Sequence, residues 1–252
     1  MSVCVDRCLR SIYECGADES KFEVVVADTS TDNTMTRLGE WEKKHANLKV
    51  VHRDEKLLAG AARNLAFKNS IGDYVYCMDI DDCLIDDALK KMTEQLEVDD
   101  GKFDIYYCPF FSASESKASN GEVKAKKLKN LDIESIGQVP IAPWDKLYRR
   151  VLWVDFPETF MPEDTVAHFL LIDKCVSVSQ FDFAVYFYDD LNPTSISRTF
   201  DYLRVNPNNL IELAFSRHIE AKDLRQEYVS GVVHNLACMF DLRDKLKQPI
   251  VR

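Results

Sequence analysis

The chain has 252 residues, of which 46% are hydrophobic and 29% are charged, and its formal net charge at pH 7 is −10. This length is enough for one large α/β domain with a substantial core, and the composition is typical of a soluble globular protein. The negative charge argues against a nucleic-acid-binding protein, which needs a basic surface, so no nucleic-acid partner is expected. An anionic substrate is still compatible with this charge if a divalent cation lies between the two.

The cysteines and the apolar runs indicate the cellular location of the protein. The eight cysteines form no CxxC pair and no metal-ligand spacing, and most of them lie in apolar runs. This pattern favours reduced, buried thiols. No apolar run approaches the ~20 residues that span a bilayer, and the first residues do not resemble a signal peptide. We therefore expect a cytoplasmic protein without a transmembrane segment, whose membrane contact would be peripheral and at the inner face.

Helix and strand patterns alternate in the first third of the chain. Apolar residues at helical spacing predict a helix over residues 5–15. The β-branched run FEVVVA at residues 22–27 is typical of a strand buried on both faces. The same reasoning predicts, in chain order, helix 35–45, strand 48–52, helix 59–69 and strand 74–78. This spacing is that of βαβ units, so we expect a mainly parallel sheet flanked by helices.

The remainder of the chain is less regular. It contains a predicted helix at 86–98, a strand at 103–111, a polar surface hairpin or mobile loop at 112–130, a helix at 164–174, a strand region at 176–188 and amphipathic helices at 203–218 and 221–246. We divide the chain into a catalytic domain of residues 1–198 and a C-terminal helical extension of residues 199–252.

Two acidic clusters follow predicted strands, which is where ligands bind in parallel α/β sheets. Asp28 follows FEVVVA, and three further carboxylates follow YVYCM, namely Asp79, Asp81 and Asp82. Three carboxylates within four residues repel one another unless they are solvated or neutralised. Because a divalent cation with oxygen ligands neutralises them, the second cluster predicts a Mg²⁺ or Mn²⁺ site that bridges to substrate phosphates. A solvated turn is the alternative interpretation.

A third acidic pair, Glu163 and Asp164, stands at the predicted start of a helix. Carboxylates in the first turn are favoured by the helix dipole in any protein, so this pair taken alone is explained equally well by capping and by function.

Six short motifs occur in order along the chain: VVVADTSTDNT, AARNLA, GDYVYCMDIDD, PWDKLYRR, MPEDT and YFYDDLNPTSIS. In this order they resemble the family-2 glycosyltransferases of the GT-A fold, over residues 6–197. The resemblance implies a Rossmann-like α/β fold and a metal-dependent enzyme that uses Mn²⁺ or Mg²⁺. Such an enzyme moves a sugar from a nucleotide diphosphate sugar, usually a UDP-sugar, to an acceptor hydroxyl with inversion. It also implies a place in cell-surface polysaccharide or glycan synthesis.

The resemblance also assigns roles on the donor side. It implies that Asp28 contacts the nucleotide base and that Arg63 lies near the nucleotide and its phosphates. Asp79 and Asp81 form the DxD pair, in which Asp81 ligates the metal and Asp79 lies near the ribose. Asp82 is a candidate helper of this pair.

On the acceptor side, the resemblance implies that Asp164 is the general base that deprotonates the acceptor hydroxyl, and that Glu163 supports it. Trp144 and Lys146 would line the acceptor or donor-sugar side of the site.

The N-terminus departs from the family pattern. Family members usually begin with an apolar strand and a turn that clasps the base, whereas here the helical pattern at residues 5–15 matches the first helix. A chain that lacks this first strand has an exposed sheet edge beside the donor site. A degenerate, non-catalytic transferase domain is therefore one alternative. Another is a phosphatase of the haloacid-dehalogenase type, because CMDIDDCL resembles its motif, with Asp79 and Asp81 as the acting residues. The donor sugar, the acceptor and the oligomeric state stay open.

Overall fold

The computed structural model describes residues 2–119, 125, 127–128, 141–158 and 163–193. The two predicted C-terminal helices and the proposed domain boundary lie outside these residues. The helices and 3-10 turns are α1 (Ser2–Tyr13), η1 (Glu19–Lys21), α2 (Thr34–Glu42), α3 (Ala59–Lys68), α4 (Ala88–Asp99), α5 (Ala113–Ala118), η2 (Pro143–Asp145), η3 (Arg150–Leu152) and α7 (Glu163–Asp173). The strands are β1 (Val24–Asp28), β2 (Leu48–His52), β3 (Tyr74–Tyr76), β4 (Cys83–Leu84), β5 (Ile105–Tyr107), β6 (Phe110–Ser112), β7 (Lys146–Arg149), β8 (Val178–Gln180) and β9 (Tyr186–Tyr188).

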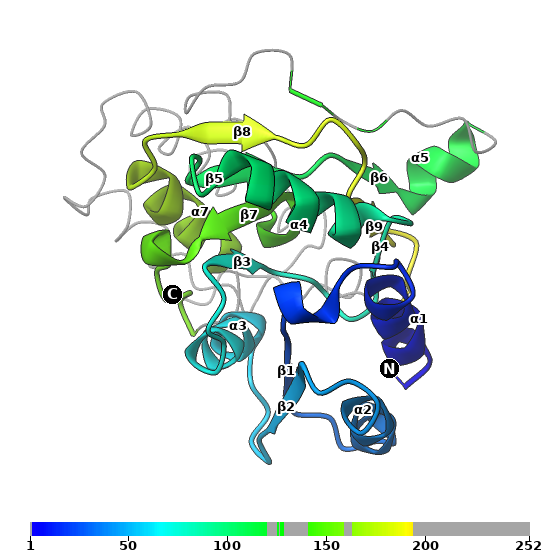
Figure 1. The fold of residues 1–252 in the computed structure, drawn as a ribbon. Helices are drawn as coiled ribbons and strands as arrows, with labels where there is room; N and C mark the ends of the chain where they lie inside the picture. Colours follow the sequence, from blue (N-terminus) through cyan, green and yellow to red (C-terminus); the bar gives the residue numbers. More distant parts are fainter. Residues whose placement is uncertain (1, 120–124, 126, 129–140, 159–162, 194–252) are drawn as a thin grey trace, which may run out of the picture.

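The described strands form three sheets, with β1 beside β2, the order β3-β7-β5-β8, and the order β4-β9-β6 (Figure 1). The pairs β1–β2, β5–β8 and β6–β9 are parallel, whereas β3–β7, β5–β7 and β4–β9 are antiparallel. The α/β class is confirmed, but the described sheets are mixed rather than mainly parallel. The main reason is β7, which enters between β3 and β5 and runs against both of them.

Helices cover both faces of the four-stranded sheet. Ile105 and Tyr107 of β5 belong to one core cluster together with Leu171 of α7. Tyr106 belongs to a second cluster together with Met92 of α4. Because successive residues of a strand point to opposite faces, α7 lies on one face of the sheet and α4 lies on the other, as Figure 1 shows for α4 in front of β7.

Strand β1 is less buried than its all-apolar sequence predicts. Its first four residues are only half-buried, and Asp28, which ends the strand, is its one fully buried residue. Among the described strands β1 pairs only with β2, so the predicted burial on both faces is not observed there.

The predicted strand at 103–111 is divided into β5 and β6. Pro109 lies between the two strands and has no N–H to continue a ladder of hydrogen bonds. The chain therefore turns at this point, and β6 joins the separate sheet formed with β4 and β9. The predicted strand region at 176–188 is likewise divided, into β8 and β9.

The polar segment expected as a hairpin or mobile loop begins instead with a short helix, α5. The Ser112 hydroxyl caps this helix by accepting a hydrogen bond from the N–H of Glu115 (3.3 Å). The carboxylate of Asp190 accepts a further hydrogen bond from the N–H of Ser114 (2.8 Å). This local cap and the long-range hydrogen bond to Asp190 explain a helix that the composition of the segment did not predict.

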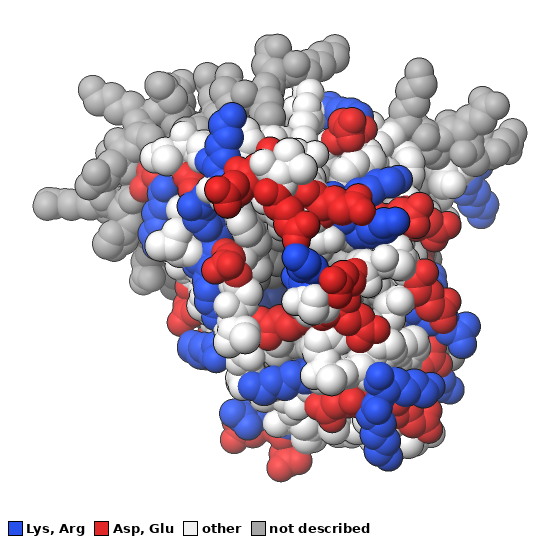
Figure 2. Space-filling view, viewed as in Figure 1, with Lys and Arg blue, Asp and Glu red and all other residues white. Residues whose placement is uncertain are grey.

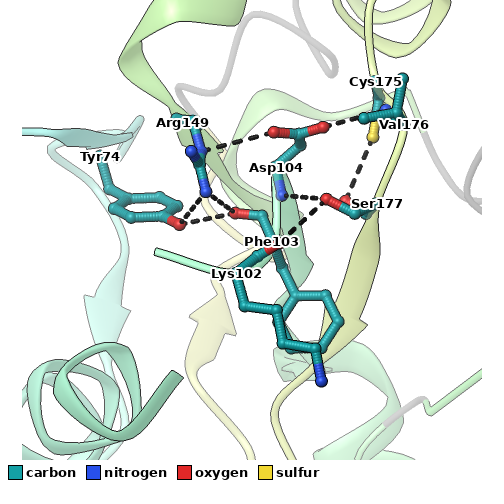
Figure 3. A network of polar contacts seen from close by, with 8 residues as sticks. All are labelled: Tyr74, Lys102, Phe103, Asp104, Arg149, Cys175, Val176 and Ser177. Atoms are coloured by element: carbon teal, nitrogen blue, oxygen red, sulfur yellow. Dashed lines mark hydrogen bonds and ion pairs between the residues drawn. The ribbon is translucent and has the colours of Figure 1, made fainter. Parts of the chain in front are cut away.

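The buried carboxylate of Asp104 links neighbouring strands at the end of the four-stranded sheet where β5 and β8 begin (Figure 3). It accepts a hydrogen bond from the N–H of Val176 (3.0 Å) and lies 3.4 Å from Nε of Arg149. Its own N–H donates to Oγ of Ser177 (3.1 Å). This network lies at the amino ends of β5 and β8, opposite the strand ends that carry the DxD pair, so we assign it a structural role.

Candidate active site

On the face of the molecule drawn in Figure 2, surface charge does not single out a binding area. Figure 2 shows acidic and basic side chains interspersed over the described residues of this face. Such a mixed surface is typical of solvated protein, and the charge on this face is no sign of a ligand.

The loop that follows β3 carries the DxD pair, and its three carboxylates have different surroundings. The side chain of Asp79 is 41% exposed, and Asp81 is partly exposed as well. Asp82, in contrast, is buried, and both of its carboxylate oxygens are occupied. One accepts a hydrogen bond from the hydroxyl of Tyr186 (2.6 Å) and the other from the N–H of Asp189 (2.7 Å). Asp79 and Asp81 are thus accessible to a ligand, whereas Asp82 is buried and accepts hydrogen bonds within the protein.

The surroundings of Asp82 make its ionised form less favourable than that of an exposed carboxyl. Burial raises the pKa of this carboxyl to about 7, although the hydrogen bonds from Tyr186 and from the N–H of Asp189 act in the opposite direction. The negative charges of Asp79 and Asp81 add to the increase.

Asp81 is held by residues from two distant parts of the chain. Its carboxylate accepts a hydrogen bond from Nδ2 of Asn192 (2.8 Å), and its backbone carbonyl accepts one from the guanidinium of Arg7 in α1. The same guanidinium lies 3.0 Å from the carboxylate of Asp189. Neither Arg7 nor Asn192 was identified from the sequence, because neither lies near the acidic cluster along the chain.

Arg63 of α3 joins the DxD loop to the start of α7. Its Nη2 lies 3.2 Å from the carboxylate of Asp79, and its Nη1 lies 3.1 Å from the carboxylate of Glu163. The guanidinium also lies over the ring of Phe156, 5.4 Å from its centroid. Burial lowers the pKa of Arg63, but the neighbouring carboxylates, Asp79 first, outweigh this effect and raise it. The structure therefore brings together three residues that the sequence analysis placed on the two sides of the site.

At the start of α7, Glu163 is buried and Asp164 is half-buried. Burial raises the pKa of both Glu163 and Asp164, and the positive charge of Arg63 acts in the opposite direction on both. One oxygen of Asp164 accepts a hydrogen bond from the N–H of Thr165 (2.7 Å). A carboxylate with a raised pKa is a stronger proton acceptor than a free one, which is what a general base needs.

The residue after Arg63 fixes how α3 meets the segment that leads to α7. The amide of Asn64 donates to the carbonyl of Phe156 and accepts from its N–H, both at 2.8 Å. A Cβ atom on Gly60, one turn earlier in α3, would overlap the carbonyl oxygen of Pro157. The AARN motif thus supplies one residue that pairs with the acidic side chains and one that positions the backbone.

Asp28 lies at the end of β1 and pairs with the residue opposite it at the end of β2. Its carboxylate forms a hydrogen bond with Nδ1 of His52 (2.8 Å) and accepts another from the N–H of Ser30 (3.3 Å). The two parallel strands have the same length and register, which places Asp28 beside His52. The sequence analysis missed His52, and the matched strand ends were the signal that could have found it.

Trp144 and Lys146 are both buried in this structure. The indole of Trp144 stacks on the rings of Tyr186 and Tyr188, each with a centroid distance of 4.9 Å. The ammonium of Lys146 pairs with Asp145 inside the core, where burial lowers the pKa of Lys146 and raises that of Asp145 to about 6. Their assignment to the acceptor or donor-sugar side stays a prediction.

The chemistry of the accessible carboxylates fits a hard divalent cation. Asp79 and Asp81 offer only oxygen donors and are separated by one residue, and Mg²⁺ and Mn²⁺ typically bind one or two carboxylates together with phosphate oxygens. No group of three or more His, Cys, Asp or Glu side chains suited to a metal was found within the described residues. A cation bound here would therefore take its remaining ligands from a phosphate-bearing substrate and from water.

The fold and the site define a class. The chain resembles solved structures of GT-A glycosyltransferases, and its mixed α/β architecture is a GT-A fold. The model of the family described as "Glycosyl transferase family 2" matches residues 3–150, so the chain belongs to this family. Membership removes the phosphatase interpretation of Asp79 and Asp81.

Two solved structures illustrate the similarity of the fold. The structure of S. aureus TarS residues 1–349 in complex with UDP-GlcNAc has a TM-score of 0.69 and 22% identity, over 83% of this chain and 61% of that one. The mannosyltransferase PcManGT of Pyrobaculum calidifontis, solved with GDP-Man and Mn²⁺, has a TM-score of 0.59 and 16% identity, over 96% of this chain and 77% of that one.

Two relatives match by sequence over shorter stretches. A poly(ribitol-phosphate) beta-glucosyltransferase of Bacillus spizizenii is 32% identical over 89 residues, which is 34% of this chain and 14% of the relative. The Bacillus subtilis protein TuaG, named for teichuronic acid biosynthesis, is 38% identical over 71 residues, or 28% of each chain. The aligned stretches thus span less than a third of these relatives. Within the described part of the chain, none of the helices has the length and apolar character needed to cross a membrane.

Proposed function

We propose that the chain transfers a sugar from a nucleotide diphosphate sugar, with UDP as the favoured nucleotide, to a hydroxyl of a cell-surface glycan, with inversion at the sugar carbon. The observation that carries this proposal is the position of Arg63 between Asp79 and Glu163, which brings the predicted donor and acceptor residues into one site. The UDP-GlcNAc complex of TarS and the names of the two Bacillus relatives support the donor and acceptor classes. The predicted cytoplasmic location agrees with a nucleotide-sugar donor and stays a prediction.

On the donor side, Asp81 would hold a Mn²⁺ or Mg²⁺ ion and Asp79 would lie beside it. When bound, the cation stabilises the negative charge of the departing diphosphate. Arg63 adds a fixed positive charge at this place, because its guanidinium lies 3.2 Å from Asp79. Asp28, held by His52, would accept a hydrogen bond from the base.

On the acceptor side, Asp164 would accept the proton of the acceptor hydroxyl. Glu163 would support it through Arg63, which pairs with Glu163 and whose positive charge also acts on Asp164. The acceptor oxygen forms a bond to the anomeric carbon while the bond from that carbon to the diphosphate oxygen breaks. The electron pair of the broken bond leaves with the diphosphate. Because attack and departure occur on opposite sides of the carbon, this arrangement inverts its configuration.

The test is the thermal unfolding midpoint with UDP, GDP and CDP, each with and without Mn²⁺, for the wild type and Asp81→Ala. A nucleotide at 100 times its dissociation constant stabilises the folded state by about 2.7 kcal/mol, which shifts the midpoint measurably. Asp86→Ala is the matched control, because it removes an exposed carboxylate a few residues further along the chain.

Metal-dependent stabilisation by one nucleotide, lost in Asp81→Ala and kept in Asp86→Ala, is the expected result, and it also identifies the base. If no nucleotide stabilises the wild type, the donor site is refuted and the degenerate-domain interpretation takes its place.

A further inference from the structure

The hydroxyl of Tyr186 lies between the two ends of the DxD loop. It donates a hydrogen bond to Oδ2 of Asp82 (2.6 Å) and accepts one from the backbone N–H of Asp79 (3.2 Å). The other oxygen of Asp82 accepts from the N–H of Asp189, three residues further along the chain from Tyr186 (2.7 Å). Strand β9 and the turn after it thus hold the loop at its first and its last carboxylate.

The position of this hydroxyl is set by the core and not by the loop. Tyr186 is fully buried, and its ring stacks on Trp144 with an interplanar angle of 11°. Its edge meets the ring of Tyr76 at 78°. Its backbone lies in the middle of a sheet, paired with Leu84 on one side and with Phe110 on the other. Because these contacts fix Tyr186, the loop has to adopt the conformation that satisfies its hydroxyl.

We propose that Tyr186 and Asp82 are positioning residues that hold the Asp79–Asp81 loop in the conformation that binds the divalent cation of the donor complex. This inference rests on the proposed function. Neither residue needs to touch the cation. Their effect is to fix the direction of the Asp79 peptide and the separation of the two accessible carboxylates, in the way that hydrogen-bond partners of metal ligands commonly set metal affinity.

The hydroxyl can be removed without removing the ring. Tyr186→Phe keeps the stacking on Trp144 but leaves the N–H of Asp79 and one oxygen of Asp82 without their present partner. A buried carboxylate oxygen and a partly buried N–H that both lose a partner favour a rearranged loop. Tyr76→Phe is a matched control, because the Tyr76 hydroxyl is also buried and has no hydrogen-bond partner within the described residues.

The experiment measures the apparent dissociation constant of Mn²⁺ from the free-ion electron paramagnetic resonance signal, with UDP present and with GDP and CDP in parallel samples. The wild type, Tyr76→Phe and Tyr186→Phe are compared, and the unfolding midpoint of each metal-free chain is recorded. We expect the Tyr186→Phe constant to rise about tenfold, within the range seen when partners of metal ligands are removed, and the Tyr76→Phe constant to stay unchanged.

A purely structural role for Tyr186 would lower the unfolding midpoint and leave the Mn²⁺ constant of the folded chain unchanged, and that result would overturn the inference. If Tyr186→Phe does not fold, Asp82→Asn takes its place, because it keeps the size of the side chain but loses one of the two acceptors. Wild-type chain that binds no Mn²⁺ with any of the three nucleotides would overturn the proposed function, and this inference with it.

Discussion

Replacing Arg63 by alanine removes the cation between Asp79 and Glu163 and leaves Glu163, whose side chain is 8% exposed, buried next to Asp164. Removing one partner of a buried ion pair typically costs about 3–5 kcal/mol. Because Asp79 is 41% exposed and water screens its charge, we expect a smaller loss of unfolding free energy, about 2–4 kcal/mol near pH 8.

The loss should depend on pH with a definite sign. Arg63 lowers the pKa of Glu163 and of Asp164, which burial raises, so its removal raises both further. Between the pKa values of these two carboxyls in the folded wild type and their higher values in the folded variant, the folded variant binds more protons. The stability of the variant therefore falls more steeply than that of the wild type as the pH rises through this window. The destabilisation should therefore be larger at pH 8 than at pH 5.

Urea unfolding of both chains at the two pH values measures this difference. Arg37→Ala is the control, because Arg37 is 42% exposed and pairs with Asp6 at the surface, so its loss should cost no more than about 1 kcal/mol. An equal cost for Arg63→Ala at pH 5 and pH 8 would refute the reasoning, because it would show that packing of the side chain and not its charge stabilises this part of the fold.

Two further outcomes follow from the site. His52→Ala should weaken the binding of UDP about five- to tenfold in calorimetry, because Asp28 loses a hydrogen bond worth about 1 kcal/mol, whereas His52→Asn keeps a donor near the position of Nδ1 and should bind nearly as the wild type does. Equal affinities of all three chains would contradict this role. Since burial raises the pKa of Asp164 and a general base must be ionised, kcat should fall as the pH drops through that raised value, and Asp164→Asn should lower kcat by about 10²–10⁴-fold. A kcat of Asp164→Asn close to that of the wild type would exclude it as the base.

The sequence predicted most elements of the fold because their patterns are local. Residues 22–27 and 48–52 became β1 and β2, and the apolar spacing after Leu58 became α3. What it did not predict depends on contacts between distant segments. The direction of β7 follows from its insertion between β3 and β5, and no local pattern in PWDKLYRR records this.

The same distinction between local patterns and long-range contacts explains which parts of the site the sequence predicted. Asp79, Asp81, Glu163 and Arg63 were predicted from motifs, and the structure brings Arg63 together with Asp79 and Glu163. The burial of Asp82 could not be predicted, because it depends on a hydroxyl 104 residues away in the sequence. A motif shows which side chains are present, but only packing decides which of three neighbouring carboxylates turns inward.

The contacts of Arg63 also bear on the order in which the chain folds. Its partner Asp79 lies 16 residues away along the chain, whereas its partner Glu163 lies 100 residues away. Short-range contacts form at a smaller cost in loop entropy, so the pairing with Asp79 can precede the docking of α7. Until α7 arrives, a chain emerging from the ribosome holds the arginine and the first half of the charge cluster but not the acidic pair. The complete cluster therefore assembles only when the long-range topology is in place.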